Sequence, residues 1–227
     1  MNEFYSMNNF IVKDLGVIDY EKAWTLQKEI FSGLIEAKLR GEEKEMQILF
    51  AEHPHVYTMG AHGDQNNILF NEEFLKKIDA KYYKVERGGD ITYHGYGQLV
   101  GYPVVDLERL RMGIKQYIWS IEEAIIKTLE HYNITGSRIP GATGVWVVKE
   151  GCRPGKICAI GIKTSRFVCM HGFALNVTTN LQYFNYINPC GFTDKEVTSI
   201  EKETGLKPGL KEVQEQFLNH FIKYFIN

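Results

Sequence analysis

Two short stretches of the sequence place reactive side chains among turn-forming residues. The stretch "YINPCGFTD" (186–194) holds Cys190 between a proline and a glycine, where a thiol is accessible and can act as a nucleophile. The stretch "ERGGDITYHGYGQ" (86–98) holds four glycines, whose backbone N–H groups can bind an oxyanion or a carbonyl oxygen. The alternatives are a buried structural thiol and a glycine-rich hairpin with polar residues on its wet face.

A lysine begins one of the apolar stretches, "GKICAIGIK" (155–163). Partial burial of the Lys156 ammonium lowers its pKa and makes it a usable base. A solvated lysine at a strand end is the alternative, and Lys163 is a second candidate in the same stretch. In "CMHGFALNV" (169–177), His171 stands before an apolar run, a setting typical of a structural histidine.

No metal or nucleotide motif of a familiar kind occurs. His53 and His55 lie two residues apart in "HPH" without a defined third ligand, so no metal site is predicted. A G-x-x-x-x-G-K-[ST] loop is absent, which leaves nucleotide hydrolysis of that type unsupported. The four cysteines form no C-x-x-C pair and are expected to be free thiols; they are Cys152, Cys158, Cys169 and Cys190.

Composition is typical of a globular protein. The chain has 227 residues, of which 44% are hydrophobic, enough for one large domain or two small ones. A net charge of -2 argues against nucleic acid and anionic membrane surfaces as partners. The first residues lack a secretory signal, and no apolar run approaches the ~20 residues of a membrane span. We therefore expect a soluble protein of the cytoplasm.

Hydrophobic periodicity predicts three long helices and a mostly antiparallel sheet, which is the α+β class. Pro103 indicates that its strand lies at an edge or carries a bulge. Thr193 and Glu196 form a capping box that predicts a helix start. The helices are expected at 19–40, 114–132 and 210–225, with a short one near 71–78. The strands are expected at 46–51, 82–87, from 91, and at 98–107, 144–149, 156–165 and 167–177.

Six segments taken together resemble one known family, the octanoyltransferases, also called lipoyl(octanoyl) transferases or lipoate-protein ligases B. They are "EHPHVYTMG", "RGGDITYHGYGQ", "GATGVWV", "KICAIGIK", "HGFALNV" and "INPCGF", in the order that the family shows. The resemblance runs from about Met46 to Ile200. The combination of R-G-G-x-x-T-Y-H-G with K-I-x-x-I-G and N-P-C-G is specific.

This resemblance implies a biotin/lipoyl protein ligase catalytic fold, related to class II synthetase cores. It implies a single domain over 1–227 with its catalytic core at about 45–227. The implied reaction moves an octanoyl group from octanoyl-acyl carrier protein to a lysine of a lipoyl domain, the first step of endogenous protein lipoylation. The implied acceptors are the lipoyl domains of 2-oxoacid dehydrogenase complexes and the glycine cleavage H protein. The family favours a monomer, and no cofactor or metal is implied.

The family's site residues fall on matching positions of this chain. Its acyl-thioester cysteine falls on Cys190, and its pKa-lowering lysine falls on Lys156, not Lys163. The chain departs from the family at His55 and Tyr96, where proline is usual. The implied acyl-binding residues are Arg87, Gly88, Gly89, Asp90, Ile91, Thr92, Tyr93, His94, Ala159, Ile160, Gly161, Gly172, Phe173 and Ala174.

Three other functions are alternatives. An ATP-dependent lipoate ligase would share the fold, but those enzymes carry a third glycine where this chain has Asp90. A non-catalytic lipoyl-domain or acyl-carrier binding protein would not need both Cys190 and Lys156. A cysteine hydrolase would pair Cys190 with His94 or His171 and release free fatty acid.

Overall fold

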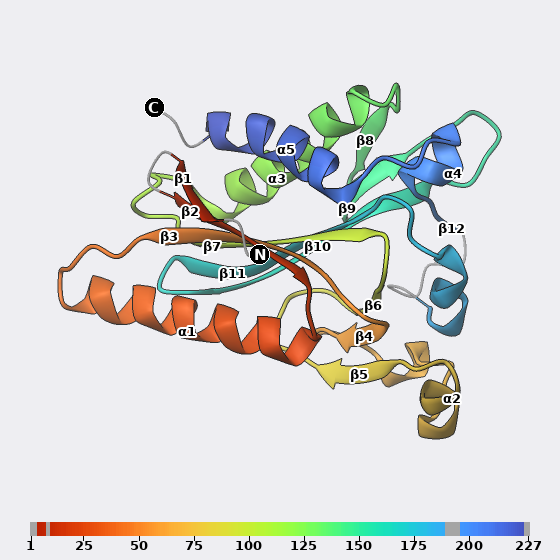
Figure 1. Cartoon of the computed structure of the whole chain (residues 1–227), viewed down its shortest axis with the longest axis horizontal. Coiled ribbons are helices and arrows are strands. Elements are labelled where there is room, and N and C mark those ends of the chain that lie inside the picture. Colours follow the sequence, from red (N-terminus) through yellow and green to blue (C-terminus); the bar gives the residue numbers. More distant parts are fainter. Residues whose placement is uncertain (1–3, 8–9, 189–195, 225–227) are drawn as a thin grey trace.

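The computed structural model describes residues 4–7, 10–188 and 196–224, which form two β-sheets and the helices packed on them (Figure 1). In these residues the main sheet has the order β1-β2-β3-β7-β11-β10-β9-β8, with β12 beside β10. Its neighbours are antiparallel except β2 with β3 and β10 with β12, so the predicted mixed, mostly antiparallel sheet is confirmed. The strands are β1 (Phe4–Met7), β2 (Phe10–Val17), β3 (Met46–Glu52), β7 (Gln98–Asp106), β8 (Gly136–Ile139), β9 (Ala142–Val147), β10 (Gly155–Ser165), β11 (Val168–Asn176) and β12 (Glu196–Val197).

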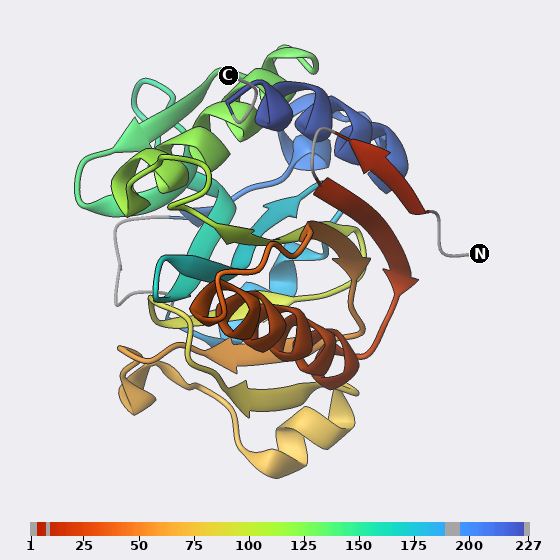
Figure 2. The ribbon, with the colours of Figure 1, turned by 90° about the vertical axis from the view of Figure 1, so that its left-hand side faces the viewer.

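The long helices cover both faces of this sheet. Helix α1 (Tyr20–Leu39) lies on one face, while α3 (Ile114–Glu130) and α5 (Leu210–Phe221) lie together on the other (Figures 1 and 2). Asp19 caps α1, because its carboxylate accepts a hydrogen bond from the Glu21 N–H at 3.0 Å. The helix predicted over 19–40 is therefore confirmed.

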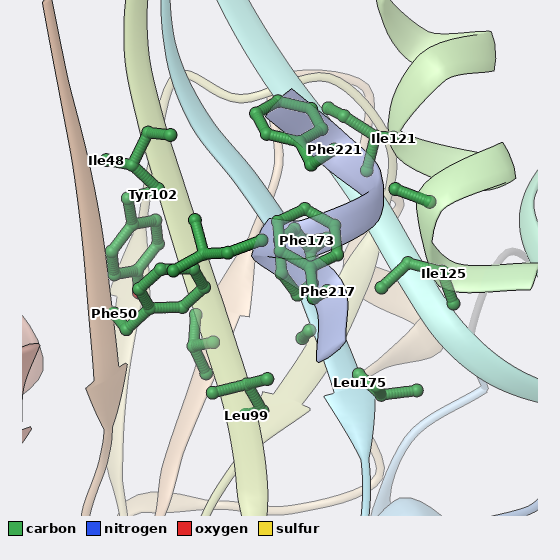
Figure 3. Close-up of a cluster of buried hydrophobic side chains, with 14 of the residues drawn as sticks. Ile48, Phe50, Leu99, Tyr102, Ile121, Ile125, Phe173, Leu175, Phe217 and Phe221 are labelled. Atoms are coloured by element: carbon green, nitrogen blue, oxygen red, sulfur yellow. The ribbon is translucent and has the colours of Figure 1, made fainter. Parts of the chain in front are cut away.

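A cluster of phenylalanine rings joins α5 to the sheet (Figure 3). The Phe217 ring centroid lies 4.4 Å from that of Phe173 on β11 and 6.0 Å from that of Phe50 on β3. Phe221 stacks on Phe217 one turn further along the helix, at 4.9 Å. Spacing of four residues puts both rings on one face of α5, which is the face that the sheet buries.

The strand that contains Pro103 lies at the centre of the sheet, so the prediction of an edge was wrong. β7 pairs with β3 on one side and β11 on the other. Paired residues of β7 and β11 are 105–106 with 168–169 and 98–101 with 173–176, and between these runs His171 takes a φ of +62°. The His171 N–H donates to Gln27 Oε1 on α1 at 3.1 Å. Proline is tolerated here because the strand opposite it leaves the regular ladder.

A smaller sheet, with the order β5-β4-β6, lies beside one end of α1 (Figure 1). Its strands are β4 (Val56–Met59), β5 (Lys81–Lys84) and β6 (Ile91–His94), with α2 (Glu72–Lys77) in the connection between β4 and β5. The strand predicted over 82–87 ends at Lys84, since the chain turns through the glycines that follow. A Cβ at Gly60 would lie 2.2 Å from the Gly89 carbonyl oxygen, so close approach of the two loops requires glycine there.

The chain from residue 196 onward begins with β12 and α4 (Ile200–Thr204). Thr193, the predicted helix cap, lies outside the described residues. Glu196, its predicted partner, belongs to β12, and Ser199 caps α4 by accepting a hydrogen bond from the Lys202 N–H at 3.1 Å. Within the described part of the chain, no helix combines the length and apolarity needed to cross a bilayer.

Candidate active site

A cavity of about 300 Å³ is lined by residues of both sheets and of α1. Most of the predicted acyl-binding residues contribute to its wall, together with Lys156. The predicted residues that line it are Arg87, Gly89, Asp90, Ile91, Thr92, His94, Lys156, Ala159, Ile160, Gly161, Gly172, Phe173 and Ala174. Segments more than 80 positions apart in the sequence therefore meet at one place.

The strand register shows in which order the wall residues follow one another along the cavity. Ala159 on β10 pairs with Ala174 on β11, which pairs with Val100 on β7, and this row is apolar. Toward the start of β10, the wall is formed by Lys156 and by the exposed residues Gly141 and Thr143. This end is the mouth of the cavity, because its residues reach solvent.

The glycine turn is fastened to β10. The Gly88 N–H donates to the Ile162 carbonyl oxygen at 2.8 Å, and Arg87 Nη1 donates to the Gly88 carbonyl oxygen at 3.0 Å. A Cβ on Gly161 would lie 2.8 Å from that same carbonyl oxygen, so Gly161 allows the turn to approach the strand. The Gly88 N–H is thus engaged and is not among the backbone groups that can bind a carbonyl.

Arg87 and His94 are joined through a threonine of the small sheet. Arg87 Nη2 donates to the Thr58 carbonyl oxygen at 2.6 Å and to Thr58 Oγ1 at 3.0 Å. Thr58 Oγ1 lies 3.3 Å from His94 Nε2. Both side chains are almost fully buried, and pairing holds them in place at the cavity wall.

The hydrogen bonds continue from His94 into the main sheet. Gln98 Nε2 donates to Asn176 Oδ1 at 2.9 Å, so Gln98 Oε1 accepts from His94 Nδ1 at 2.9 Å. Asn176 Nδ2 donates to the Thr198 carbonyl oxygen at 3.0 Å, and the Thr198 N–H donates to the Lys156 carbonyl oxygen at 3.0 Å. This series of buried hydrogen bonds fixes the tautomer of His94 and connects the small sheet to the backbone of Lys156.

The two histidines of the cavity are neutral at pH 7. Burial, followed by the nearby His53 and Arg87, lowers the pKa of His94 to about 3. Burial, followed by Arg87 and Lys163, lowers the pKa of His171 to about 3. An imidazole of such low basicity is a poor general base for a thiol, which argues against a Cys–His hydrolase.

The cavity includes Lys156 and not Lys163. The Lys156 Nζ lies 4.6 Å from the centroid of the Trp146 ring, within range of a cation–π contact. Lys163 lies seven residues further along β10 than Lys156, and its ammonium forms an ion pair with Glu86. The two lysines, which are both candidate bases from the local sequence, therefore differ in their position relative to the cavity.

The predicted nucleophile, Cys190, lies outside the described residues. Of the cysteines that are described, Cys158 and Cys169 are buried and Cys152 is exposed. Burial raises the pKa of the Cys169 thiol to about 11 and that of the Cys158 thiol further. Neither buried thiol has the thiolate character that acyl transfer needs at neutral pH.

Two of the predicted acyl-binding residues do not line the cavity. Gly88 faces β10, and the Tyr93 ring lies in a small core where it stacks on Tyr183 with centroids 4.9 Å apart. Alternation along β6 accounts for Tyr93, because Thr92 and His94 face the cavity and Tyr93 between them faces the opposite way. Phe173 lines the cavity, but its ring packs on Phe217.

Several lining residues were not predicted from the sequence. Gln98, Val100 and Tyr102 alternate along β7, a period-2 signal that could have placed them on one face. Tyr20 follows the cap of α1, and no local pattern marks it, since its role depends on how the helix packs on the sheet. His171, expected to be structural, also lines the cavity.

The two departures from the family pattern contact one another away from the cavity. The rings of His55 and Tyr96 lie edge to face with centroids 5.3 Å apart, and His55 stacks on Tyr183 at 4.2 Å. His55 Nδ1 lies 2.6 Å from the Tyr93 hydroxyl. His53 Nδ1 instead lies 2.7 Å from the Ile18 carbonyl oxygen, so the two histidines of "HPH" serve different clusters.

Comparison with known proteins decides the family. Residues 19–222 match the model of the lipoyl protein ligase A/B catalytic domain. An octanoyltransferase of Bacteroides fragilis is 50% identical over 206 residues, covering 91% of this chain and 93% of that protein. The octanoyltransferase of Parabacteroides distasonis is 48% identical over 220 residues, covering 96% and 100%. This chain belongs to the octanoyltransferase family.

Solved structures support the fold of this octanoyltransferase. A bipartite lipoate protein ligase from Thermoplasma acidophilum is 15% identical with a TM-score of 0.68, covering 94% of this chain and 82% of that one. A biotin protein ligase from Aquifex aeolicus is 14% identical with a TM-score of 0.51, covering 96% and 69%. The predicted biotin/lipoyl protein ligase fold is confirmed, and the enzyme is an acyltransferase.

Proposed function

We propose that this octanoyltransferase moves the octanoyl group from octanoyl-acyl carrier protein to a lysine of a lipoyl domain, through a thioester on Cys190. The observation that carries the proposal is the position of Lys156 at the mouth of a cavity whose middle is apolar. Phe184 and Val197, which flank residues 189–195 in the sequence, both line this cavity. At ~0.8 kcal/mol per buried CH₂, the walls would bind an eight-carbon chain by several kcal/mol.

The first half-reaction transfers the acyl group to the enzyme. The Cys190 thiolate attacks the carbonyl carbon of the donor thioester, the new C–S bond forms, and the carrier thiolate leaves with the electron pair of the broken bond. Exchange of one thioester for another is nearly isoenergetic. The Lys156 ammonium favours the thiolate form of a nearby thiol by its positive charge.

The second half-reaction transfers the acyl group to the acceptor lysine. That lysine arrives as an ammonium and gives one proton to Lys156, which is neutral because it has protonated the departing carrier thiolate in the first half-reaction. Its amine attacks the acyl-enzyme, an amide forms as the C–S bond breaks, and the second proton of the attacking nitrogen goes to the released Cys190 sulfur. Because an amide is more stable than a thioester, this step is downhill without ATP. Lipoyl domains of 2-oxoacid dehydrogenase complexes and the glycine cleavage H protein are the proposed acceptors.

Intact-protein mass spectrometry after incubation with octanoyl-acyl carrier protein tests the thioester. We expect an octanoyl adduct that hydroxylamine removes, and its absence in Cys190→Ala. The matched control is Cys152→Ala, which removes an exposed thiol and should keep the adduct. In a second arm, Lys156→Ala should slow both half-reactions by ~100-fold, while Lys163→Ala should not. A normal rate of octanoyl transfer by Cys190→Ala would exclude the mechanism.

A further inference from the structure

The inner end of the cavity, opposite the mouth at Lys156, contains buried polar side chains. Beyond the apolar row of Ala159, the wall reaches Gly161 and then His171, Tyr20 and Tyr102. Those last three residues are only 2 to 3% exposed, so their polar atoms are shielded from bulk solvent. An acyl chain that enters at the mouth therefore passes the Gln98–Asn176 pair, then the apolar row, and meets His171 last.

Two buried side-chain nitrogen atoms, one on the cavity wall and one on helix α1 behind it, have no hydrogen-bond partner within the described residues. They are His171 Nε2 and Gln27 Nε2, and Gln27 is completely buried. The two residues are linked, because Gln27 Oε1 accepts the His171 N–H at 3.1 Å. Buried polar groups in native proteins are almost always paired, either with protein or with an ordered water. His171 Nε2, on the cavity wall, is thus suited to hold a water molecule at the end of the cavity.

The length of an octanoyl chain matches the apolar part of the cavity. An extended eight-carbon chain spans ~9 Å from its carbonyl carbon to its methyl carbon. Three residues of a strand span ~10 Å, which is the separation of Lys156 from Ala159 along β10. A chain whose carbonyl lies beside Lys156 therefore ends near Ala159 and Ala174, before it reaches His171.

We propose that His171, held by Gln27, sets the upper length of the acyl chain by keeping a water molecule at the inner end of the cavity. This inference rests on the proposed function, because it takes Lys156 to mark the thioester end of the chain. Two further methylenes would displace the water and leave the buried His171 Nε2 without a partner. An unmade hydrogen bond of this kind costs about 10-fold in affinity.

Chain-length profiles of two His171 variants test the proposal. We would measure kcat/KM with octanoyl- and decanoyl-acyl carrier protein and compare the ratio of decanoyl to octanoyl. His171→Leu removes the polar group at similar volume and should raise the ratio ~10-fold. His171→Asn creates more space but stays polar and tolerates the positive φ, so it should leave the ratio unchanged. The opposite pattern, a higher ratio for Asn only, would mean that space sets the length and would overturn the proposal.

Leucine is strained at a positive φ, but the ratio does not depend on how much of the variant folds. A second measurement needs no variant. A crystal structure of the wild-type enzyme with octanoate should show a water within hydrogen-bond distance of His171 Nε2. A methyl group packed directly against that nitrogen would overturn the proposal. Absence of turnover with both donors, together with a water in the octanoate complex, would count against the proposed donor and not against this inference.

Discussion

Three buried histidines make the stability of the protein depend on pH. Burial lowers the pKa of His53 to about 4, and those of His94 and His171 to about 3, below the ~6.5 of an unfolded chain. As pH falls below 6.5, the unfolded chain binds protons that the folded chain does not. The stabilisation is therefore complete above pH 6.5 and is lost as pH falls toward 4, at up to ~4 kcal/mol per pH unit for three groups.

Urea unfolding between pH 7.5 and 4.5 measures this slope. His53→Gln should reduce the slope by up to ~1.4 kcal/mol per pH unit, since it removes one buried titrating group. His62→Gln is the matched control, because His62 is exposed on a loop, and it should leave the slope unchanged. Equal slopes for the wild type and His53→Gln would mean that His53 is not buried in its neutral form.

At the scale of single elements, α1 connects helix stability with the shape of the cavity. Its first residue, Tyr20, lines the cavity, and Asp19 caps the helix directly before it. Asp19 also pairs with Lys81 of β5 at 2.6 Å. Asp19→Ala should lower the free energy of unfolding by ~1–2 kcal/mol, mostly through the lost cap, because exposed ion pairs contribute little.

Asp19→Asn separates the cap from the charge, since asparagine caps helices as well as aspartate does. It should cost less than ~1 kcal/mol, the upper value for an exposed pair. Urea unfolding of both variants gives the comparison. If Asp19→Asn lowered the free energy of unfolding as much as Asp19→Ala does, the loss would come from the ion pair with Lys81 and not from the helix cap.

The elements show which predictions sequence patterns support and where they stop. The helix over 19–40 was predictable because a cap and an apolar face coincide there. Pro103 led to the wrong prediction of an edge strand. The irregularity that accommodates the proline lies on the neighbouring strand β11, at His171, and no local sequence pattern marks it. The strand predicted to reach Arg87 ended early because the glycine turn is set by contacts with Gly60 and Gly161, which are distant in sequence.

The sequence predicted which segments form the candidate site, but it did not predict how these segments are arranged around the cavity. Motif resemblance selected the residues of the glycine turn and of β10 and β11 that meet at the cavity. It did not select Tyr20, Gln98 or Asn176, whose positions depend on packing between elements. Tyr93 lies within the motif but serves a separate core, because strand alternation turns its ring away from the cavity.

At the scale of the whole molecule, the cavity lies where two hydrophobic cores meet. The large core joins the main sheet to α1, α3 and α5, and the small core surrounds Tyr57, Ile91 and Tyr93 on the small sheet. The small core buries far fewer apolar side chains, so its strands should open at a lower free energy than β7 or β11. Hydrogen bonds through Gly88 and Gln98 connect the two parts across the cavity.

Amide hydrogen exchange with octanoate tests this division. Without ligand, β5 at the edge of the small sheet should exchange faster than β4 and β6, and β7 and β11 should exchange slowest. Octanoate bound in the cavity would contact both sheets. Amide exchange in β6 and the glycine turn should then be slower, because these segments could open only after the ligand is released. Helix α5 lies on the opposite face of the main sheet and is connected to the cavity wall through Phe173, whose ring packs on Phe217, so a smaller change is expected there than in β6. Slower exchange in α5 but not in β6 would place the ligand on the wrong side of the sheet.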